Sequence, residues 1–483
     1  MARIAIAAVV KKVGKKVKVS GWVHSRRDHG KIIFIDLRDR SGLLQVVFEP
    51  GNKEAYELAE KLRPEYVVAL EGTINQRPEK LVNKKIATGA VELAGEKLEI
   101  LNEAKTPPFE IEGQQEPGEE IRMKYRYLDL RRERLKKNIE SRHKVVKVVR
   151  DYFDQEGFWE IETPILTKGT PEGAREFMVP ARLWPGKFYV LPQSPQQFKQ
   201  LLMVAGTEKY FQIARCFRDE DMRGDRQAEF TQIDVEMSFV EPEDIFEIIE
   251  GLMLAIAEKL YPEKKVAQKP FPRLSYHEAI KAHQTDKPDL RQDKNDNNEL
   301  AFVWIVDMPM FEYSKTEKKL VAKHHPFTMP NLADREKYPQ DPLKWRAYAY
   351  DLVLNGYEIF GGSIRIHRRD IQNQVFDLLG LKEKEIQNRF GHMLEAFDYG
   401  APPHGGSAGG LDRIVAILQN EPNIREVIPF PKTGDNRDFM MAAPNVVGKK
   451  ALKEANIEIS QAAKEQAKEK GEELEGFDTV MAE

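Results

Sequence analysis

The sequence predicts an α+β protein with two domains: a small N-terminal β-barrel and a larger domain in which antiparallel strand pairs alternate with helices. Three observations support this prediction. Residues 17–101 contain five short runs with strand-like alternation. Residues 102–125 are rich in proline and glutamate without a regular period, which is typical of a linker. Residues 210–239 contain two apolar-alternating runs around a charged loop, as in an antiparallel strand pair.

The composition indicates a globular protein of two or three domains. Of its 483 residues 41% are hydrophobic, and the net charge of −3 means that any nucleic-acid contact must come from a local patch. The single cysteine, Cys216, lies in an apolar run, so we expect a buried thiol in a reducing cytoplasm. The apolar residues 4–10 are too few for a membrane span and lack a signal-peptide cleavage pattern, so we expect no membrane association.

The N-terminal runs have the pattern of an OB-fold, in which a helix lies between the third and fourth of five strands. The strands are expected at residues 17–23, 32–38, 43–48, 66–75 and 90–101, and the helix at 53–62. OB-folds bind single-stranded nucleic acids by stacking bases on aromatic side chains over a basic groove. Arg26, Arg27, Phe34 and Gln45 cluster on the first three strands, although Phe34 could equally be a core residue.

The loop after residue 217 has the residue types of a nucleotide site. Arg218 and Glu220 follow the first run, Gly-Asp-Arg-Gln occupies 224–227, and Phe230 opens the return run. Arginine can bind a phosphate with two hydrogen bonds, a carboxylate can orient an amine, and phenylalanine can stack on a base. The alternative is a solvated hairpin with cross-strand ion pairs.

A second, distant segment strengthens the nucleotide interpretation. Residues 405–410 are Gly-Gly-Ser-Ala-Gly-Gly, and a helix is predicted from Leu411 onward, with Arg413 one turn into it. Glycines let a backbone approach a ligand closely, and the N-terminus of a helix favours anions.

Two carboxylates, Asp351 and Glu358, flank a predicted hairpin turn and could face each other across it. Two facing carboxylates are costly without a cation, so this pair favours a Mg²⁺ ion. The pair His324-His325 lacks partners at ligand spacing, so a zinc site is not expected.

Helical patterns occur in three further places: a long amphipathic helix ends near Gly157, another covers 243–260, and the Ala/Lys/Glu-rich residues 448–474 form a solvated tail. Two cations lie in apolar surroundings. Taken alone, Lys199 is expected at the surface with a buried stem, and Arg365 on the polar face of a sheet beside an acid.

The segments 217–220 (Phe-Arg-Asp-Glu) and 410–413 (Gly-Leu-Asp-Arg) resemble motifs 2 and 3 of class II aminoacyl-tRNA synthetases. The longer runs 212–221 and 227–234 are similar to the bacterial type of aspartyl-tRNA synthetase, and the resemblance extends from about residue 17 to about 443. The implied domains are an OB-fold anticodon-binding domain at 1–104, a hinge at 105–125, a class II catalytic domain with an antiparallel sheet flanked by helices at 126–443, and a helical tail at 444–483.

The sequence departs from this family at one place. Bacterial members carry an inserted domain after the residues that match Asp286–Arg291, whereas here only the polar residues 292–298 connect Arg291 to the strand expected at 300–307. Because that domain is remote from the chemistry in the family, we expect activity to survive its absence.

The resemblance implies a two-step ligation. ATP and aspartate form aspartyl-adenylate and pyrophosphate, and the aspartyl group then moves to the terminal ribose of tRNA(Asp). Neither step requires a protein nucleophile, so catalysis rests on positioning and on charge stabilisation with Mg²⁺.

The family also forms a homodimer through the helix that ends near Gly157 and the following residues 157–164. The alternative is that this helix packs on its own domain.

The resemblance also implies roles for individual residues. Arg218, Glu220 and Arg413 would act in catalysis, with Arg218 on the α-phosphate and Arg413 on the γ-phosphate. The aspartate site would comprise Glu172, Gln196, Lys199, Arg218, Asp234, His324 and Arg365. The ATP site would comprise Arg218, Glu220, Gln227, Phe230, Glu358, Gly410, Leu411, Asp412 and Arg413. Asp351 and Glu358 would hold the Mg²⁺, and the anticodon would contact Arg27, Phe34, Gln45 and Glu92.

Two alternatives share parts of this pattern. Asparaginyl- and lysyl-tRNA synthetases have the same fold and motifs, but two cations, Lys199 and Arg365, favour an anionic amino-acid side chain. A catalytically inactive paralogue that only binds nucleic acid would not need Arg218, Glu220 and Arg413 together.

The tRNA specificity depends on two residues of the N-terminal domain. His29 lies where strict bacterial enzymes often carry leucine, so the loop 28–30 resembles the relaxed form, which also charges tRNA(Asn). Lys80 in the neighbouring loop favours the strict form, which charges tRNA(Asp) alone. We favour the relaxed form.

Overall fold

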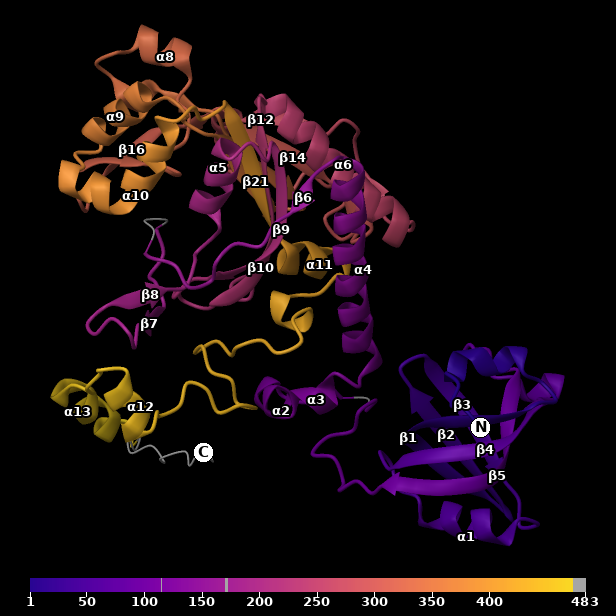
Figure 1. The fold of residues 1–483 in the computed structure, drawn as a ribbon. Coiled ribbons are helices and arrows are strands. Elements are labelled where there is room, and N and C mark those ends of the chain that lie inside the picture. The colour runs from indigo at the N-terminus through magenta and orange to yellow at the C-terminus, as the bar shows by residue number, and fades with distance from the viewer. Residues whose placement is uncertain (114, 170–172, 472–483) are drawn as a thin grey trace. The chain divides into compact units, whose positions relative to one another are not determined.

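The computed structural model describes residues 1–113, 115–169 and 173–471 (Figure 1). The chain divides into two compact units, Met1–Pro117 and Gly118–Glu483, and each is described by itself. Among the described residues, no helix combines the length and the apolar character needed to cross a membrane.

The first unit is a closed five-stranded barrel, which confirms the predicted OB-fold. Its strands, in spatial order, are β1 (Lys16–His29), β2 (Ile32–Asp39), β3 (Gly42–Phe48), β5 (Val91–Asn102) and β4 (Val67–Gln76), and α1 (Lys53–Lys61) follows β3. Alternate strand residues such as Ile33, Ile35 and Leu37 fill the barrel. The apolar N-terminal run forms a 3-10 helix, η1 (Ile6–Lys11), which buries Ile6 and Val9 in the same core.

The second unit is built on an eight-stranded sheet with all neighbours antiparallel except the outermost pair at each edge. In spatial order the strands are β12 (Arg273–Ser275), β14 (Phe302–Val306), β19 (Ala349–Leu354), β20 (Tyr357–Ile364), β21 (His404–Gly410), β10 (Glu229–Ser238), β9 (Lys209–Phe217) and β6 (Trp159–Glu160). The predicted strand pair of residues 210–239 is β9 and β10, which lie side by side between β21 and the edge strand β6.

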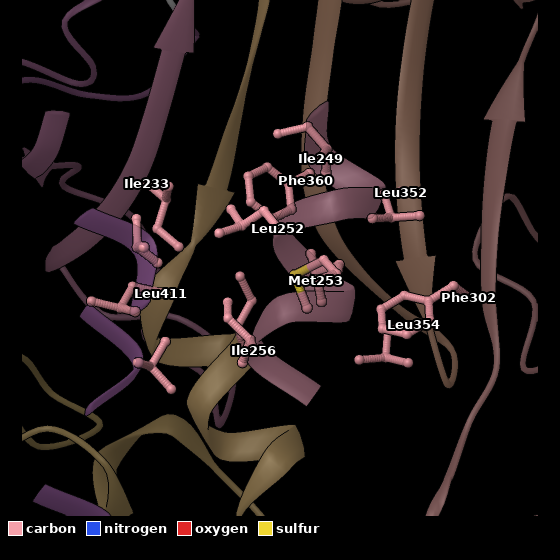
Figure 2. Close-up of a cluster of buried hydrophobic side chains, with 14 of the residues drawn as sticks. Ile233, Ile249, Leu252, Met253, Ile256, Phe302, Leu352, Leu354, Phe360 and Leu411 are labelled. Carbon is pink, nitrogen blue, oxygen red and sulfur yellow. The ribbon is translucent and has the colours of Figure 1, made fainter. Parts of the chain in front are cut away.

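Three helices cover one face of the sheet: α4 (Glu133–Gln155), α6 (Pro242–Leu260) and α11 (Leu411–Leu418). Figure 2 shows residues of α6, among them Leu252 and Ile256, against Ile233 of β10 and Phe360 of β20. Because α4 buries one side in this core, it packs on its own domain. The opposite side of α4, which includes Lys137, Glu140 and Lys147, is exposed.

The remaining elements surround this framework. They are the helices α5 (Gln196–Val204), α7 (Tyr276–His283), α8 (Leu332–Lys337), α9 (Arg369–Leu378) and α10 (Glu383–Phe397), the strand pairs β7 (Met178–Pro180) with β8 (Phe188–Val190), β11 (Lys265–Val266) with β13 (Glu299–Leu300), β15 (Met308–Pro309) with β18 (Arg346–Ala347), and β16 (Phe311–Ser314) with β17 (Lys319–Ala322), and the tail helices α12 (Lys449–Glu454) and α13 (Gln461–Glu469).

Part of the segment expected as a linker is helical. Helix α2 (Glu119–Lys124) lies within residues 105–125, and α3 (Arg126–Asp129) follows it. The reason is a buried ion-pair network: Arg122 donates to Asp129 at 3.0 Å and to Glu426, 304 residues away, at 2.6 Å. Because Glu426 is so distant in sequence, residues 119–124 carry no local pattern that predicts this contact or the helix.

The short connection at 292–298 is closed by polar turns. The side chains of Asp293 and Asp296 accept from the backbone N–H groups of Asn295 and Asn298, at 2.9 and 2.8 Å. Lys264 donates to the carbonyl of Asn297 at 2.6 Å. The chain therefore passes directly from Arg291 to β13.

Candidate active site

Two adjoining cavities lie on the sheet face opposite α6. Strand alternation creates this face, because β10 directs Ile233 and Val235 into the core and Gln232, Asp234 and Glu236 away from it. The cavities measure about 220 and 320 Å³ and share Arg218, Gln232, Glu358 and Ala408.

The smaller cavity contains a buried four-charge cluster. Lys199 on α5 donates to Asp234 at 2.7 Å, and its ammonium lies 3.3 Å from Glu236. The guanidinium of Arg365 binds both oxygens of Glu236, at 3.0 and 3.2 Å. The four side chains are almost completely buried and their formal charges cancel. Lys199 and Arg365, which the resemblance assigns to the substrate's side-chain carboxylate, therefore each already have an acidic partner, and Lys199 is not at the surface. Such pairing is expected because an unpaired buried charge is strongly destabilising.

Burial and charge act against each other at the two acids of this cluster. Burial raises the pKa of Asp234, and the charge of Lys199 only partly opposes it. For Glu236 burial acts in the same direction, but the charges of Arg365 and Lys199 outweigh it and lower the pKa. Glu236 is also the acid that contacts both cations, at 3.3 Å from Lys199 and 3.0 Å from Arg365.

Three buried polar atoms on this cavity have no hydrogen-bond partner among the described residues: Oδ2 of Asp234, Nε2 of His324 and Nε of Arg218. Burial, followed by the charge of Lys323, lowers the pKa of His324, so its imidazole is neutral at pH 7. The neighbouring His325 stacks on Phe327 with ring centroids 5.0 Å apart. Oδ2 of Asp234 can accept a hydrogen bond from one ammonium group. Nε2 of His324 and Nε of Arg218 can donate hydrogen bonds to one or two anionic groups.

The larger cavity has the geometry of a base-stacking site. The guanidinium of Arg218 lies over the ring of Phe230, 5.1 Å from its centroid. Glu220 pairs with Arg226 at 3.1 Å in the same loop. Gln227 lines the cavity, but its amide exchanges two hydrogen bonds with the backbone of Lys432, at 3.1 and 2.7 Å, so it also anchors that segment.

The helix that begins after the glycine run starts as predicted, with α11 at Leu411. Gly410 precedes it, and Arg413 in its first turn donates to the carbonyl of Glu358 and lies 3.3 Å from Asp225. The side chains of Leu411 and Asp412, which lie between Gly410 and Arg413, make other contacts. Leu411 is in the core, and Asp412 accepts from the backbone N–H of Thr231 at 3.0 Å and pairs with Arg142.

The expected Mg²⁺ ligands lie close together, though not as direct partners across the hairpin. Asp351 pairs with Gly361 across β19 and β20, whereas Glu358 pairs with Val353 because a bulge follows Leu352. A Cβ placed on Gly361 would lie 3.0 Å from Oδ1 of Asp351 and 3.4 Å from Oε1 of Glu358. Both carboxylates therefore border the open space above that glycine.

This pair suits a cation. Burial and then the charge of Glu358 raise the pKa of Asp351 well above its ordinary value, so a positive ion between the two acids would relieve the repulsion. In the described part of the chain, no group of three or more His, Cys, Asp or Glu could hold a metal. Mg²⁺ is commonly bound by one or two carboxylates together with substrate phosphates and water, so two suffice.

Of the residues expected to bind aspartate, Glu172 lies outside the described residues. Gln196 lines the smaller cavity and donates to Gln200 at 3.1 Å. Two site residues were missed by sequence reasoning. Glu236 could have been found, because Asp234 and Glu236 are two acids at strand spacing that alternate with the apolar residues Ile233, Val235 and Met237. Lys287, which pairs with Glu358 at 2.7 Å, lies in a coil within Asp286–Arg291, a segment for which the sequence predicted no site role.

On the first unit, Phe34 lies on the outer side of the barrel, since its neighbours Ile33 and Ile35 point inward. The core alternative for Phe34 is therefore wrong. Arg27 is its direct cross-strand partner, and the exposed His29 meets its ring edge-on at 6.0 Å. Gln45 donates to Glu92 at 2.9 Å, while Lys80 is exposed in η2 (Glu79–Leu81).

Comparisons with known proteins agree with this architecture. Residues 118–434 match the family described as tRNA synthetases class II (D, K and N), and residues 17–101 match the OB-fold nucleic acid binding domain. The chain is similar to the aspartate–tRNA(Asp/Asn) ligase of Halothermothrix orenii, 43% identical over 574 positions, with 92% of this chain and 96% of that protein covered. The ligase of the same name from Rubrobacter xylanophilus is 42% identical over 570 positions, with 92% and 95% covered.

Both alignments are longer than this whole chain of 483 residues, so these relatives contain a long stretch that it lacks. Among solved structures, the asparaginyl-tRNA synthetase of Pyrococcus horikoshii in complex with asparaginyl-adenylate has a TM-score of 0.72 at 24% identity, with 90% of this chain and 98% of that chain covered. That likeness shows the fold.

Proposed function

The chain belongs to the class II tRNA synthetases (D, K and N), and on that premise we propose that it is an aspartate–tRNA ligase. It activates L-aspartate with ATP and transfers the aspartyl group to tRNA. The observation that carries the choice of amino acid is the similarity to the two aspartate–tRNA(Asp/Asn) ligases, at 43% and 42% identity over 92% of this chain. The unpartnered buried atoms on the smaller cavity fit such a substrate. Asp234 offers an acceptor to the ammonium of the substrate, and neutral His324 offers a ring nitrogen to its side-chain carboxylate.

The larger cavity takes ATP. Phe230 stacks on the adenine, and Arg218 lies between the two cavities, where the substrate carboxylate must meet the α-phosphate. Arg413 is directed at the terminal phosphates from the start of α11, where the helix dipole adds to its charge. Asp351 and Glu358 would hold Mg²⁺, which supplies neutralisation of the phosphate charge when bound. The protein contributes position and charge, and no side chain acts as a nucleophile.

The amino acid is tested by pyrophosphate exchange with aspartate, asparagine and lysine as separate substrates. We expect exchange with aspartate at least a hundredfold faster than with either competitor, because a site built for one polar group rejects its analogue strongly. Faster exchange with asparagine or lysine would overturn the assignment of aspartate.

The proposed tRNA specificity is the relaxed one, in which both tRNA(Asp) and tRNA(Asn) are charged. Exposed His29 beside Phe34 and the names of the two relatives support this proposal. It is tested by aspartylation of the two purified transcripts side by side. Charging of tRNA(Asp) alone would refute the use of His29 and leave the ligase activity in place.

A homodimer is also proposed. Trp159 on the edge strand β6 is 67% exposed, in the segment where the resemblance expects the interface. Light scattering on the purified protein tests this, since a monomeric mass at micromolar concentration contradicts it.

A further inference from the structure

A lysine without an assigned role lies in the nucleotide cavity. Lys287 follows α7 in a coil, and its ammonium lies 2.7 Å from Oε2 of Glu358. It lines the same cavity as Phe230 and Arg413. Its side chain is 42% exposed and that of Glu358 33%, so the ion pair opens onto the cavity and is not sealed in the core.

The backbone holds this lysine in place. Two residues later, Asp289 accepts from the backbone N–H of Arg291 at 3.1 Å and from its guanidinium at 2.8 Å. The segment also packs on the turn that precedes Glu358. A Cβ on Gly356, which has φ +87°, would lie 3.5 Å from Cβ of Asp289 and 3.9 Å from the carbonyl oxygen of Lys287. The lysine and the hairpin that carries its partner are therefore one packed unit.

Lys287 lies among three acids. The negative charges of Glu358, Asp351 and Asp286 all favour the charged form of its ammonium group. Burial alone would lower the pKa of Lys287, but the charge of Glu358 and the hydrogen bond to it raise the pKa. The ammonium therefore lies on Oε2 of Glu358, while Oε1 of the same carboxylate faces the space proposed for the metal.

Building on the function proposed above, we propose that Lys287 is a phosphate-binding residue of the nucleotide site, which pairs with Glu358 in the empty enzyme and moves to the β- and γ-phosphates of ATP. An ammonium on Oε2 of Glu358 and a metal ion at its Oε1 would be two cations on one carboxylate, and they would repel each other. When the metal takes Glu358, the flexible four-carbon arm of the lysine carries its charge to the strongest acceptors nearby, which are phosphate oxygens. Lys287 thus neutralises Glu358 before ATP arrives and the triphosphate afterwards.

The test measures binding without turnover. Lys287→Gln and Lys287→Arg are titrated by calorimetry with α,β-methylene-ATP plus Mg²⁺ and, separately, with AMP. The matched control is Lys269→Gln, because Lys269 forms an exposed pair with Glu258 at 2.8 Å and lines neither cavity of the site. We expect Lys287→Gln to bind the triphosphate analogue about tenfold more weakly, the effect of one charge-assisted hydrogen bond. AMP binding should not change, and Lys287→Arg should retain most of the affinity.

A second measurement tests the exchange of partners. Without nucleotide, Mn²⁺ binding followed by electron paramagnetic resonance should be severalfold tighter in Lys287→Gln than in the unmodified protein, because the competing ammonium is gone. Combining that variant with Glu358→Gln should abolish the gain.

The outcomes separate this proposal from the function on which it rests. Equal affinity of Lys287→Gln and the unmodified protein for the analogue, or an equal loss for AMP, would overturn the phosphate role while leaving the ligase intact. Unchanged Mn²⁺ affinity would overturn the exchange. If the unmodified protein bound no ATP analogue at all, the proposed function itself would fail.

Discussion

At the scale of single residues, specificity rests on charges that are paired before the substrate arrives. Lys199 and Arg365 do not form an open positive pocket, since Asp234 and Glu236 neutralise them. A ligand therefore adds to a closed network whose geometry is already set, and selection depends on which remaining donors and acceptors it satisfies. That arrangement leaves little tolerance for the loss of any one member.

Glu236→Gln tests the importance of the network. It leaves Lys199 and Arg365 sharing one remaining acid, so we expect a loss of about 3–5 kcal/mol in the free energy of unfolding, measured in urea. Glu258→Gln, which breaks the exposed pair with Lys269, should cost less than about 1 kcal/mol. Similar values for the two variants would show that the cluster contributes nothing special to stability.

His325 should make stability depend on pH. Burial, followed by the charge of Arg365, lowers its pKa from 6.5 to about 3. The unfolded chain therefore takes up a proton near pH 6.5, while the folded chain stays neutral down to about pH 3. Stability contributed by neutral His325 is present above pH 6.5 and is lost as the pH falls, by about 2 kcal/mol at pH 5.

The measurement is a comparison of unfolding at pH 8 and pH 5 for the unmodified protein and for His325→Phe, which keeps an aromatic ring against Phe327. The variant should lose about 2 kcal/mol less over this interval. A parallel decline in both proteins would contradict a depressed pKa at His325.

At the scale of elements, strand alternation and one bulge build the site. Strand β10 separates a core face from a ligand face within ten residues, and the bulge between Leu352 and Val353 shifts the register of β19 and β20. Because of this shift, Asp351 and Glu358 both border Gly361. The glycine keeps the space between the two carboxylates free.

Gly361→Ala should therefore weaken Mg²⁺ binding at the site more than it lowers the stability of the fold. Its Cβ would meet Asp351 at 3.0 Å and Glu358 at 3.4 Å, in the space proposed for the ion. We expect the Mg²⁺ concentration for half-maximal pyrophosphate exchange to rise about tenfold, since small displacements at a reacting centre are costly. Gly51→Ala, where a Cβ meets nothing within 4 Å, is the control. An unchanged Mg²⁺ requirement would place the metal elsewhere.

At the scale of the whole molecule, the two units divide the proposed work. The second unit contains both cavities, and the first presents Phe34, Arg27 and His29 on the outer side of its barrel. Adenylate formation should then be independent of the barrel surface, whereas tRNA charging should depend on it.

Phe34→Ala separates the two steps. Loss of one base-stacking contact is worth about 1–3 kcal/mol, so kcat/KM for tRNA should fall about tenfold or more. Pyrophosphate exchange should stay unchanged, and Leu101→Ala, at an exposed apolar position of the same unit, should affect neither step. Equal charging by Phe34→Ala would remove this residue from the anticodon site.

The sequence by itself determined the elements and most of the site. The five barrel strands, the pair at 210–239 and the helix from Leu411 are where alternation, turn residues and glycines predict them, because these signals are local. It also marked Arg218, Phe230 and Arg413, whose residue types suit a nucleotide.

Only the tertiary structure decided which charges meet. The pairing of Arg365 with Glu236 joins residues 129 apart. The contact of Arg122 with Glu426 fixes the helical part, Glu119–Lys124, of the expected linker, and Lys287 reaches Glu358 from a coil. The physical reason is that the free energy of a buried charge depends on its neighbours in space. Those neighbours come from strand order and register, which the periodicity of a single segment does not contain.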